Sequence, residues 1–188
     1  MLASREVART KCVPLRDLKT DPQGNKRSPG VLSLIIVPNS KDAKPTPSSE
    51  LFDRVLNFLD ARRMAANKLV LVGPEYVRVD INADIVVMQP EMVSSVELAV
   101  RSEIDRYLHP VTGGARGTGW DYGRLPQKFD LCVLIEKIEG VSHVRELSIQ
   151  AIPDRPGAEK TGRFLICSGQ HDISMRLEVQ FATDLAQS

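Results

Sequence analysis

Apolar residues along the chain form short continuous runs and one long alternating stretch, which together predict several strands. The run 31–37 is almost wholly apolar and 68–72 is a second run of the same kind, so both are expected to be buried strands. From Val77 to Val87 every odd position is apolar, while the residues between them are mostly polar or charged. This alternation predicts a long, half-exposed strand in an antiparallel sheet.

Three further segments have the spacing of amphipathic helices. In 46–63, Thr46 offers an N-cap and Pro47 suits the first helical turn. The segment 94–108 is expected to begin at one of its two leading serines, and 126–139 to begin at its proline and stop at the glycine that follows. The apolar stripe of the second helix consists of Val96, Val100, Ile104 and Leu108.

The C-terminal part continues this succession of strands and helices. Residues 147–151 predict another strand, and 153–162 are rich in turn residues. Residues 164–166 and 173–181 are then apolar or alternating, which predicts a C-terminal β-hairpin. The order over 29–152 is βαββαβ with the second helix split by a connector, which is the ferredoxin-like pattern. We therefore predict an α+β fold with helices on one face of the sheet.

This pattern divides the chain into three parts. Residues 1–28 are expected to be an N-terminal extension and loop, 29–152 the α+β domain, and 153–188 the hairpin extension. A chain of 188 residues is long enough for one domain, or two small ones, with a real core. The 77–87 strand and the C-terminal strand are expected to leave an exposed edge, which natural proteins usually cover or pair.

The connector between the second and third helices, His109–Arg124, contains five glycines and the only tryptophan of the chain. Glycine is used where the backbone needs a positive φ or where a neighbour approaches closely, whereas flexible spacers rarely include a large aromatic residue. We interpret the stretch as an ordered connector that is clamped by Trp120 and Tyr122. A positive φ is expected for at least one of Gly113, Gly114 and Gly119.

Trp120 has two interpretations. As a plug, its ring is buried under the connector against the neighbouring helices. As an anchor, it inserts into a neighbouring subunit, since tryptophan is enriched at interface hot spots. The plug is favoured because predicted helices flank the connector on both sides.

Composition and charge argue against several classes of function. Lysine and arginine total 25 against 24 for aspartate and glutamate, so a net charge of +1 gives no reason to expect nucleic acid or an anionic membrane as the main partner. No apolar run approaches the roughly 20 residues of a membrane span, and the first residues do not resemble a signal peptide, so synthesis in the cytoplasm is expected. The three cysteines are widely spaced and predict no disulfide framework.

No motif predicts catalysis, a metal or a cofactor. The connector glycines follow a helix and lack a Gly-Lys-Ser/Thr sequence, which argues against a phosphate-binding loop. His109, His143 and His171 are too far apart for a local metal motif, and there is no Gly-x-Ser-x-Gly sequence. The alternative hypothesis is a small α/β enzyme or ligand-binding domain with its site at the connector. Its polar residues would be Arg116, Asp121 and Arg124.

Several short motifs occur in a fixed order. They include Pro-Thr-Pro at 45–47, Val-Gly-Pro-Glu-Tyr-Val at 72–77, Tyr-Leu-x-Pro at 107–110, Gly-Gly, Gly-Trp and aromatic-Gly-Arg within the connector, and Gly-Val-x-x-Val at 140–144. As an ordered set, from about Glu6 to Ile152, they resemble the C-terminal region of the baseplate J-like proteins. These proteins are wedge subunits of contractile phage tails and related contractile injection systems.

The resemblance implies a non-enzymatic structural component of the baseplate wedge, without a cofactor, that acts through protein–protein interfaces in a phage tail or phage-like particle. Its implied partners are other wedge proteins, the hub and the sheath-initiating tail proteins, and the isolated chain is expected to self-associate. Family members usually carry a large N-terminal part, so Arg5–Pro14 is interpreted as the closing edge of that part in a naturally short version, one half of a split gene, or a fragment. The residues expected to form the structural connector or an interface are Gly113, Gly114, Arg116, Gly119, Trp120, Tyr122, Gly123 and Arg124.

Overall fold

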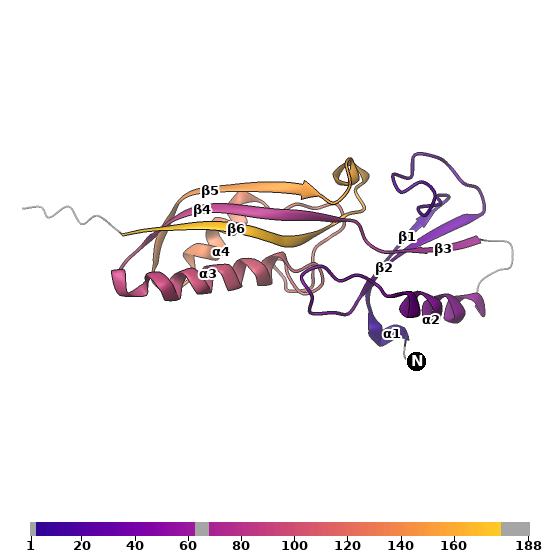
Figure 1. The fold of residues 1–188 in the computed structure, drawn as a ribbon, viewed down its shortest axis with the longest axis horizontal. Coiled ribbons are helices and arrows are strands. Elements are labelled where there is room, and N and C mark those ends of the chain that lie inside the picture. Colours follow the sequence, from indigo (N-terminus) through magenta and orange to yellow (C-terminus); the bar gives the residue numbers. More distant parts are fainter. Residues whose placement is uncertain (1–2, 63–67, 178–188) are drawn as a thin grey trace, which may run out of the picture. The chain divides into compact units, whose positions relative to one another are not determined.

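The computed structural model describes residues 3–62 and 68–177, and the contacts within the chain divide it into two compact units. The first unit comprises Met1–Val79, Asp105–Leu125 and Ala151–Ser168. The second comprises Asp80–Ile104, Pro126–Gln150 and Gly169–Ser188. Both units therefore combine segments that are distant in the sequence (Figure 1). The domain boundaries after residues 28 and 152 stay a prediction.

A mixed three-stranded sheet in the order β1-β2-β3 forms part of the first unit. β1 (Val7–Pro14) follows a single helical turn, α1 (Ala3–Glu6), and pairs antiparallel with β2 (Val31–Pro38). β3 (Lys68–Val72) pairs with β2 in parallel. The prediction of strands over 31–37 and 68–72 is therefore confirmed. Residues 35–37 of β2 are buried, as expected for a short apolar run.

α2 (Ser49–Asp60) connects β2 to β3. Its N-cap is Ser48, whose hydroxyl accepts a hydrogen bond from the N–H of Leu51 at 3.2 Å. The prediction that Thr46 caps this helix is wrong, because the Thr46 hydroxyl instead donates to the carbonyl of Lys44 at 3.2 Å. The predicted end, Arg63, lies outside the described residues. Within them the helix ends at Asp60.

The second sheet has the order β5-β4-β6 and is also mixed. Its strands are β4 (Tyr76–Val87), β5 (Val141–Pro153) and β6 (Leu165–Leu177). Backbone hydrogen bonds join residue 154 to 76 and residue 88 to 140, so β4 and β5 run antiparallel. Hydrogen bonds also join residue 165 to 75 and residue 170 to 80, so β6 runs parallel to β4. The predicted antiparallel pairing of β4 therefore holds on one side only.

The alternation along β4 is confirmed. Its odd positions from Val77 to Val87 are at most 1% exposed, whereas Asn82 is exposed and Asp80 and Asp84 are partly exposed. The prediction of an exposed edge is wrong for β4, which lies between β5 and β6. It holds for the described part of the C-terminal strand, because β6 is at one edge of this sheet. Alternation defines which face of a strand is buried, but it does not define whether the strand has one neighbour or two.

Two helices, α3 (Val93–Leu108) and α4 (Lys128–Glu136), cover one face of this second sheet (Figure 1). The predicted stripe of α3 is confirmed, since its four members are at most 1% exposed. α3 begins at Val93 after a short 3-10 turn, Pro90–Met92, and not at a serine N-cap. The Ser95 hydroxyl instead donates to the carbonyl of Met92 at 2.9 Å.

The α+β class is confirmed, but the ferredoxin-like pattern is not evident. The strands form two sheets of three instead of one continuous sheet. Pro74 follows β3, has no N–H to donate to a sheet ladder, and separates β3 from β4, which joins the other sheet. The predicted C-terminal hairpin is also wrong within the described residues, because β6 is one continuous strand from Leu165 to Leu177. Val179 and Phe181 lie outside the described residues.

Candidate functional site

The glycine-rich connector folds back onto the C-terminal end of α3. The N–H groups of Gly113 and Gly114 donate to the carbonyls of His109 and Tyr107, each at 2.8 Å. The N–H of Gly119 donates to the carbonyl of Gly113 at 2.9 Å, which closes the loop on itself. The last carbonyls of a helix have no partner within the helix, so the connector supplies donors that the end of α3 lacks.

His109 holds the first turn of the connector in place. Its ring Nδ1 accepts the N–H groups of Val111 at 3.2 Å and Thr112 at 3.1 Å. Because two backbone donors point at Nδ1, the ring proton resides on Nε2, which donates to the carbonyl of Asp42 at 3.1 Å. The imidazole therefore has a structural role in joining the connector to the loop after β2.

The prediction of a positive φ in the connector is confirmed, with φ of +76° at Gly114 and +85° at Gly119. Gly113 lacks a positive φ, but a Cβ there would lie 2.2 Å from the carbonyl oxygen of Tyr107. Glycine is required at that position by close approach, and at Gly114 and Gly119 by backbone conformation. Gly123 meets both requirements, since its φ is +76° and a Cβ would lie 2.8 Å from Gly162 Cα.

The Trp120 ring packs against the end of α3. Its ring meets the Tyr107 ring edge to face, with centroids 5.2 Å apart. Its Nε1 donates to the carbonyl of Tyr107 at 2.7 Å, so the polar edge of the indole serves as a further cap of the helix. The predicted contact with the helix that ends at Leu108 is confirmed, although the side chain stays partly exposed.

The N-terminal strand β1 binds the connector, which the sequence did not predict. Arg9 Nη1 donates to the carbonyl of Pro110 at 3.2 Å and to the carbonyl of Trp120. Lys11 Nζ donates to the carbonyl of Gly162 at 3.1 Å. The sequence could have shown that Arg9 and Lys11 share a face, since they are two positions apart on a strand. It could not show their hydrogen-bond acceptors, which are more than 100 residues away.

Tyr122 lies between these basic side chains and the core. The Arg9 guanidinium carbon is 5.3 Å from the ring centroid and Lys11 Nζ is 4.9 Å from it, which are cation–π distances. The Tyr122 side chain also packs on a buried cluster that includes Val37 and Tyr76. Burial raises the pKa of the Tyr122 hydroxyl to about 12, although Arg9 opposes the shift. Tyr122 thus clamps the connector to β1 and the core, as its role in an ordered connector requires.

The polar residues of the alternative hypothesis do not converge in this way. Arg116, Asp121 and Arg124 are exposed, and the N–H of Arg124 donates to the carbonyl of Asp121 at 3.3 Å within one turn. Over residues 3–62 and 68–177, no group of three or more histidine, cysteine or acidic residues could hold a metal ion. In the same part of the chain, no helix has the length and apolar character needed to cross a membrane. No disulfide joins cysteines of the described residues, in which Cys12 is exposed and Cys167 is buried.

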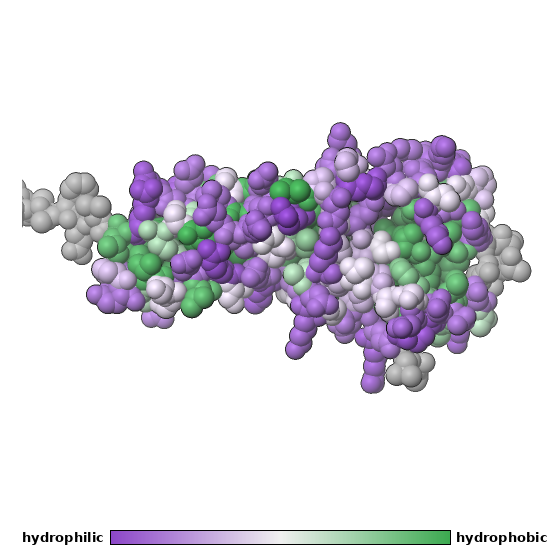
Figure 2. All heavy atoms as spheres, viewed as in Figure 1, coloured by the Kyte–Doolittle hydropathy of each residue, from purple (hydrophilic) through white to green (hydrophobic). Residues whose placement is uncertain are grey.

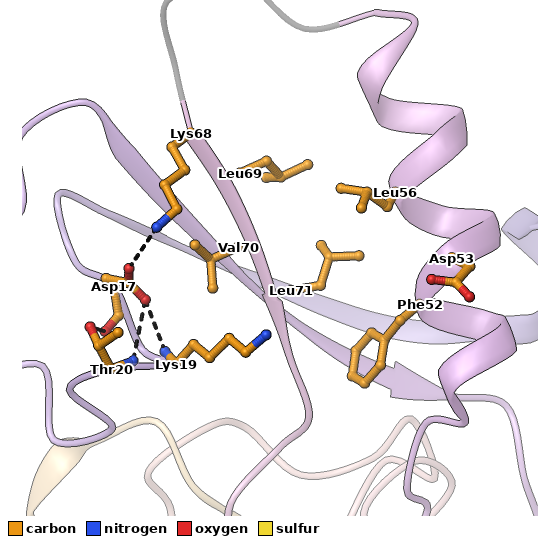
Figure 3. A pocket seen from close by; sticks show the side chains of 10 residues that line it. All are labelled: Asp17, Lys19, Thr20, Phe52, Asp53, Leu56, Lys68, Leu69, Val70 and Leu71. Atoms are coloured by element: carbon orange, nitrogen blue, oxygen red, sulfur yellow. Dashed lines mark hydrogen bonds and ion pairs between the residues drawn. The ribbon is translucent and has the colours of Figure 1, made fainter.

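A pocket of about 350 Å³ lies beside β3 in the first unit (Figure 3). Leu69 and Leu71 of β3 face Phe52 and Leu56 of α2, which form its apolar side. The loop of Asp17–Thr20 lies on the other side of the strand. A second pocket, of about 390 Å³, is polar and lies in the second unit, with lining residues Asp80, Ile81, Asn82, Ser148, Gln150, Gln170, His171 and Asp172.

Asp17 organises the loop beside the β3 pocket. Its Oδ1 accepts the N–H groups of Lys19 at 3.2 Å and Thr20 at 3.3 Å, and its Oδ2 lies 3.3 Å from Lys68 Nζ. Desolvation raises the pKa of this carboxyl, but Lys68 and the two backbone donors outweigh it, so the pKa is below its ordinary value.

Asp17→Asn is therefore expected to lower the melting temperature at neutral pH. A carboxyl with a depressed folded-state pKa contributes stability above its unfolded-state pKa and loses it as the pH falls through the folded-state value. The difference between wild type and Asp17→Asn should consequently shrink below about pH 4 and vanish at lower pH. Thermal melts from pH 7 to pH 2 test this expectation, and a constant difference over that range would contradict it.

Comparisons with known proteins establish a shared fold. No family model matches the chain, and no curated protein matches it. It is similar to a chain in the sixfold-symmetrised cryo-EM structure of the anti-feeding prophage (AFP) baseplate, with a TM-score of 0.54 and 16% sequence identity. The alignment covers 89% of this chain and 34% of that chain, so this chain spans about a third of the length of that structural relative.

Proposed function

We propose that this chain is a structural component of a contractile-tail baseplate. The observation that carries the proposal is the fold shared with a chain of the AFP baseplate over 89% of the present chain. The motif order from Pro-Thr-Pro at 45–47 to Gly-Val-x-x-Val at 140–144 supports the more specific role of a baseplate J-like wedge subunit. Its partners would be other wedge proteins, the hub and the sheath-initiating proteins.

The connector geometry supports a structural role over a ligand-binding one. The polar side chains that the alternative hypothesis would need for a ligand, Arg116, Asp121 and Arg124, are exposed, whereas the side chains that hold the connector in place bind backbone carbonyls. His109, Arg9 and the Trp120 indole all bind backbone carbonyls of the same unit. Such bonds fix the path of the chain between α3 and α4. A wedge subunit acts through extended interfaces, which require a backbone of fixed path.

Co-expression with the sheath, tube and hub proteins of a contractile system tests the proposal. The chain is expected to co-sediment with tail-like particles and to occupy a position in their baseplate by electron microscopy. Neighbouring genes that encode such proteins would supply the partners. The proposal would be overturned if the purified chain is a stable monomer that does not bind these tail proteins, and if it turns over a small molecule at a rate that one histidine or aspartate substitution abolishes.

A further inference from the structure

Strand β3 lies at one edge of the first sheet. Among the described residues β2 is its one neighbouring strand, and the pairing is parallel, with Val31 opposite Lys68. The N–H of Lys68 donates to the carbonyl of Gly30 at 2.8 Å, so residues 68, 70 and 72 direct their backbone groups toward β2. Leu69 and Leu71 therefore direct their N–H and C=O groups toward the open edge.

This edge lies in a slot between α2 and the Asp17–Thr20 loop. Phe52 and Leu56 of α2 are only partly buried, and they line the pocket beside β3 together with Leu69 and Leu71 (Figure 3). Figure 2 shows hydrophobic residues gathered over this part of the first unit. The apolar face of α2 therefore extends past β3, the edge strand of this sheet. A fourth strand beside β3 would cover Phe52 and Leu56.

The loop side of the slot carries a net positive charge. Its charged groups are Lys19, Lys68 and Asp17, and the Asp17 carboxylate is already bound by Lys68 and by two backbone N–H groups. The Lys19 side chain extends from the loop toward β3 (Figure 3). Asp53 belongs to the opposite, α2 side. A strand in the slot would therefore meet apolar groups and the Asp53 carboxylate on one face and the Lys19 ammonium group on the other.

We propose that β3 accepts a fourth strand from another protein of the assembly, an extended segment in which apolar and acidic side chains alternate. Backbone hydrogen bonds to Leu69 and Leu71 would supply affinity, and the two faces of the slot would supply specificity. The apolar side chains would contact Phe52 and Leu56, and an acidic one would pair with Lys19. A second copy of β3 does not match the slot, because β3, Lys-Leu-Val-Leu-Val, has no acidic side chain to pair with Lys19.

The proposal rests on the proposed baseplate function, and the test uses the chain in particles co-assembled with its tail proteins. Lys19→Glu reverses the charge at the slot, and Leu69→Pro removes an outward N–H without removing a donor to β2. Each variant is expected to lower incorporation about tenfold while its melting temperature is unchanged or slightly lower. The matched control is Lys26→Glu, which changes an exposed lysine in the connection between β1 and β2, outside the pocket lining, and should incorporate like wild type.

Hydrogen exchange over residues 68–72 provides the second measurement. The peptide is expected to exchange about tenfold or more slowly in the particle than in the free chain, because Leu69 and Leu71 gain partners. If wild type incorporates but Lys19→Glu and Leu69→Pro incorporate equally well, or the exchange is unchanged, the strand proposal is wrong and the baseplate function stands. If wild type does not incorporate, the baseplate function fails first and the strand proposal with it. Self-association of the purified chain that Lys19→Glu abolishes would overturn the choice of another protein as the occupant.

Discussion

Replacement of Gly119 with valine is expected to disrupt the connector and to lower the free energy of unfolding by about 3 kcal/mol or more. Two costs add at this position. The φ of +85° disfavours any residue with a Cβ, and a Cβ would lie 2.6 Å from the carbonyl oxygens of both Pro110 and Val111. Those atoms are backbone, so they cannot rotate away. Urea denaturation measures the loss, and circular dichroism should show that the sheets remain.

Gly117→Val is the matched control for the steric part of this prediction. Gly117 also has a positive φ, +67°, but the nearest atom to a Cβ there is 3.8 Å away. The backbone cost is therefore shared between the two variants, while the clash belongs to Gly119 alone. Gly117→Val should cost about 1 to 2 kcal/mol. Equal destabilisation by the two substitutions would contradict the steric account of the connector.

The local features of the connector could be predicted from the sequence, whereas its partners could not. Glycine density reports backbone conformation directly, so the positive φ at Gly114 and Gly119 followed from residue type alone. The contact of Trp120 with α3 also followed, because the two are close in sequence. Arg9 binds carbonyls more than 100 residues away, and no local pattern encodes that contact.

The same distinction explains the errors in the fold. Alternation in β4 correctly identified its buried face, because the period of two along a strand assigns residues to a face whatever the neighbouring strands are. The ferredoxin-like arrangement failed because it required the neighbours of β4, and a single sequence does not specify them. The β3 slot is a similar case. The apolar stripe of α2 was visible in the sequence. That the stripe extends past the edge of the sheet is clear only once the strand order is known.

Trp120→Ala is expected to lower the free energy of unfolding by about 2 to 3 kcal/mol, less than the roughly 3 to 5 typical of a fully enclosed aromatic residue. The smaller figure reflects the partial exposure of the ring. The loss includes the edge-to-face contact with Tyr107 and the hydrogen bond from Nε1 to the Tyr107 carbonyl. Trp120→Phe retains an aromatic edge without the donor and should cost about 1 kcal/mol less than Trp120→Ala. Emission of the native protein should be blue-shifted from that of tryptophan in water.

The same pair of variants separates the two interpretations of Trp120. If the ring is an internal plug, Trp120→Ala should lower the melting temperature while the folded variant still enters tail-like particles at low temperature. If it is an interface anchor, stability should hardly change and incorporation should fall, because hot-spot residues act in the bound state. The hydrogen bond from Nε1 to the Tyr107 carbonyl favours the plug. The only polar group of the indole is already bound to the end of α3, so it is not available to a partner. Native emission like that of free tryptophan, with unchanged melting of Trp120→Ala, would refute the plug.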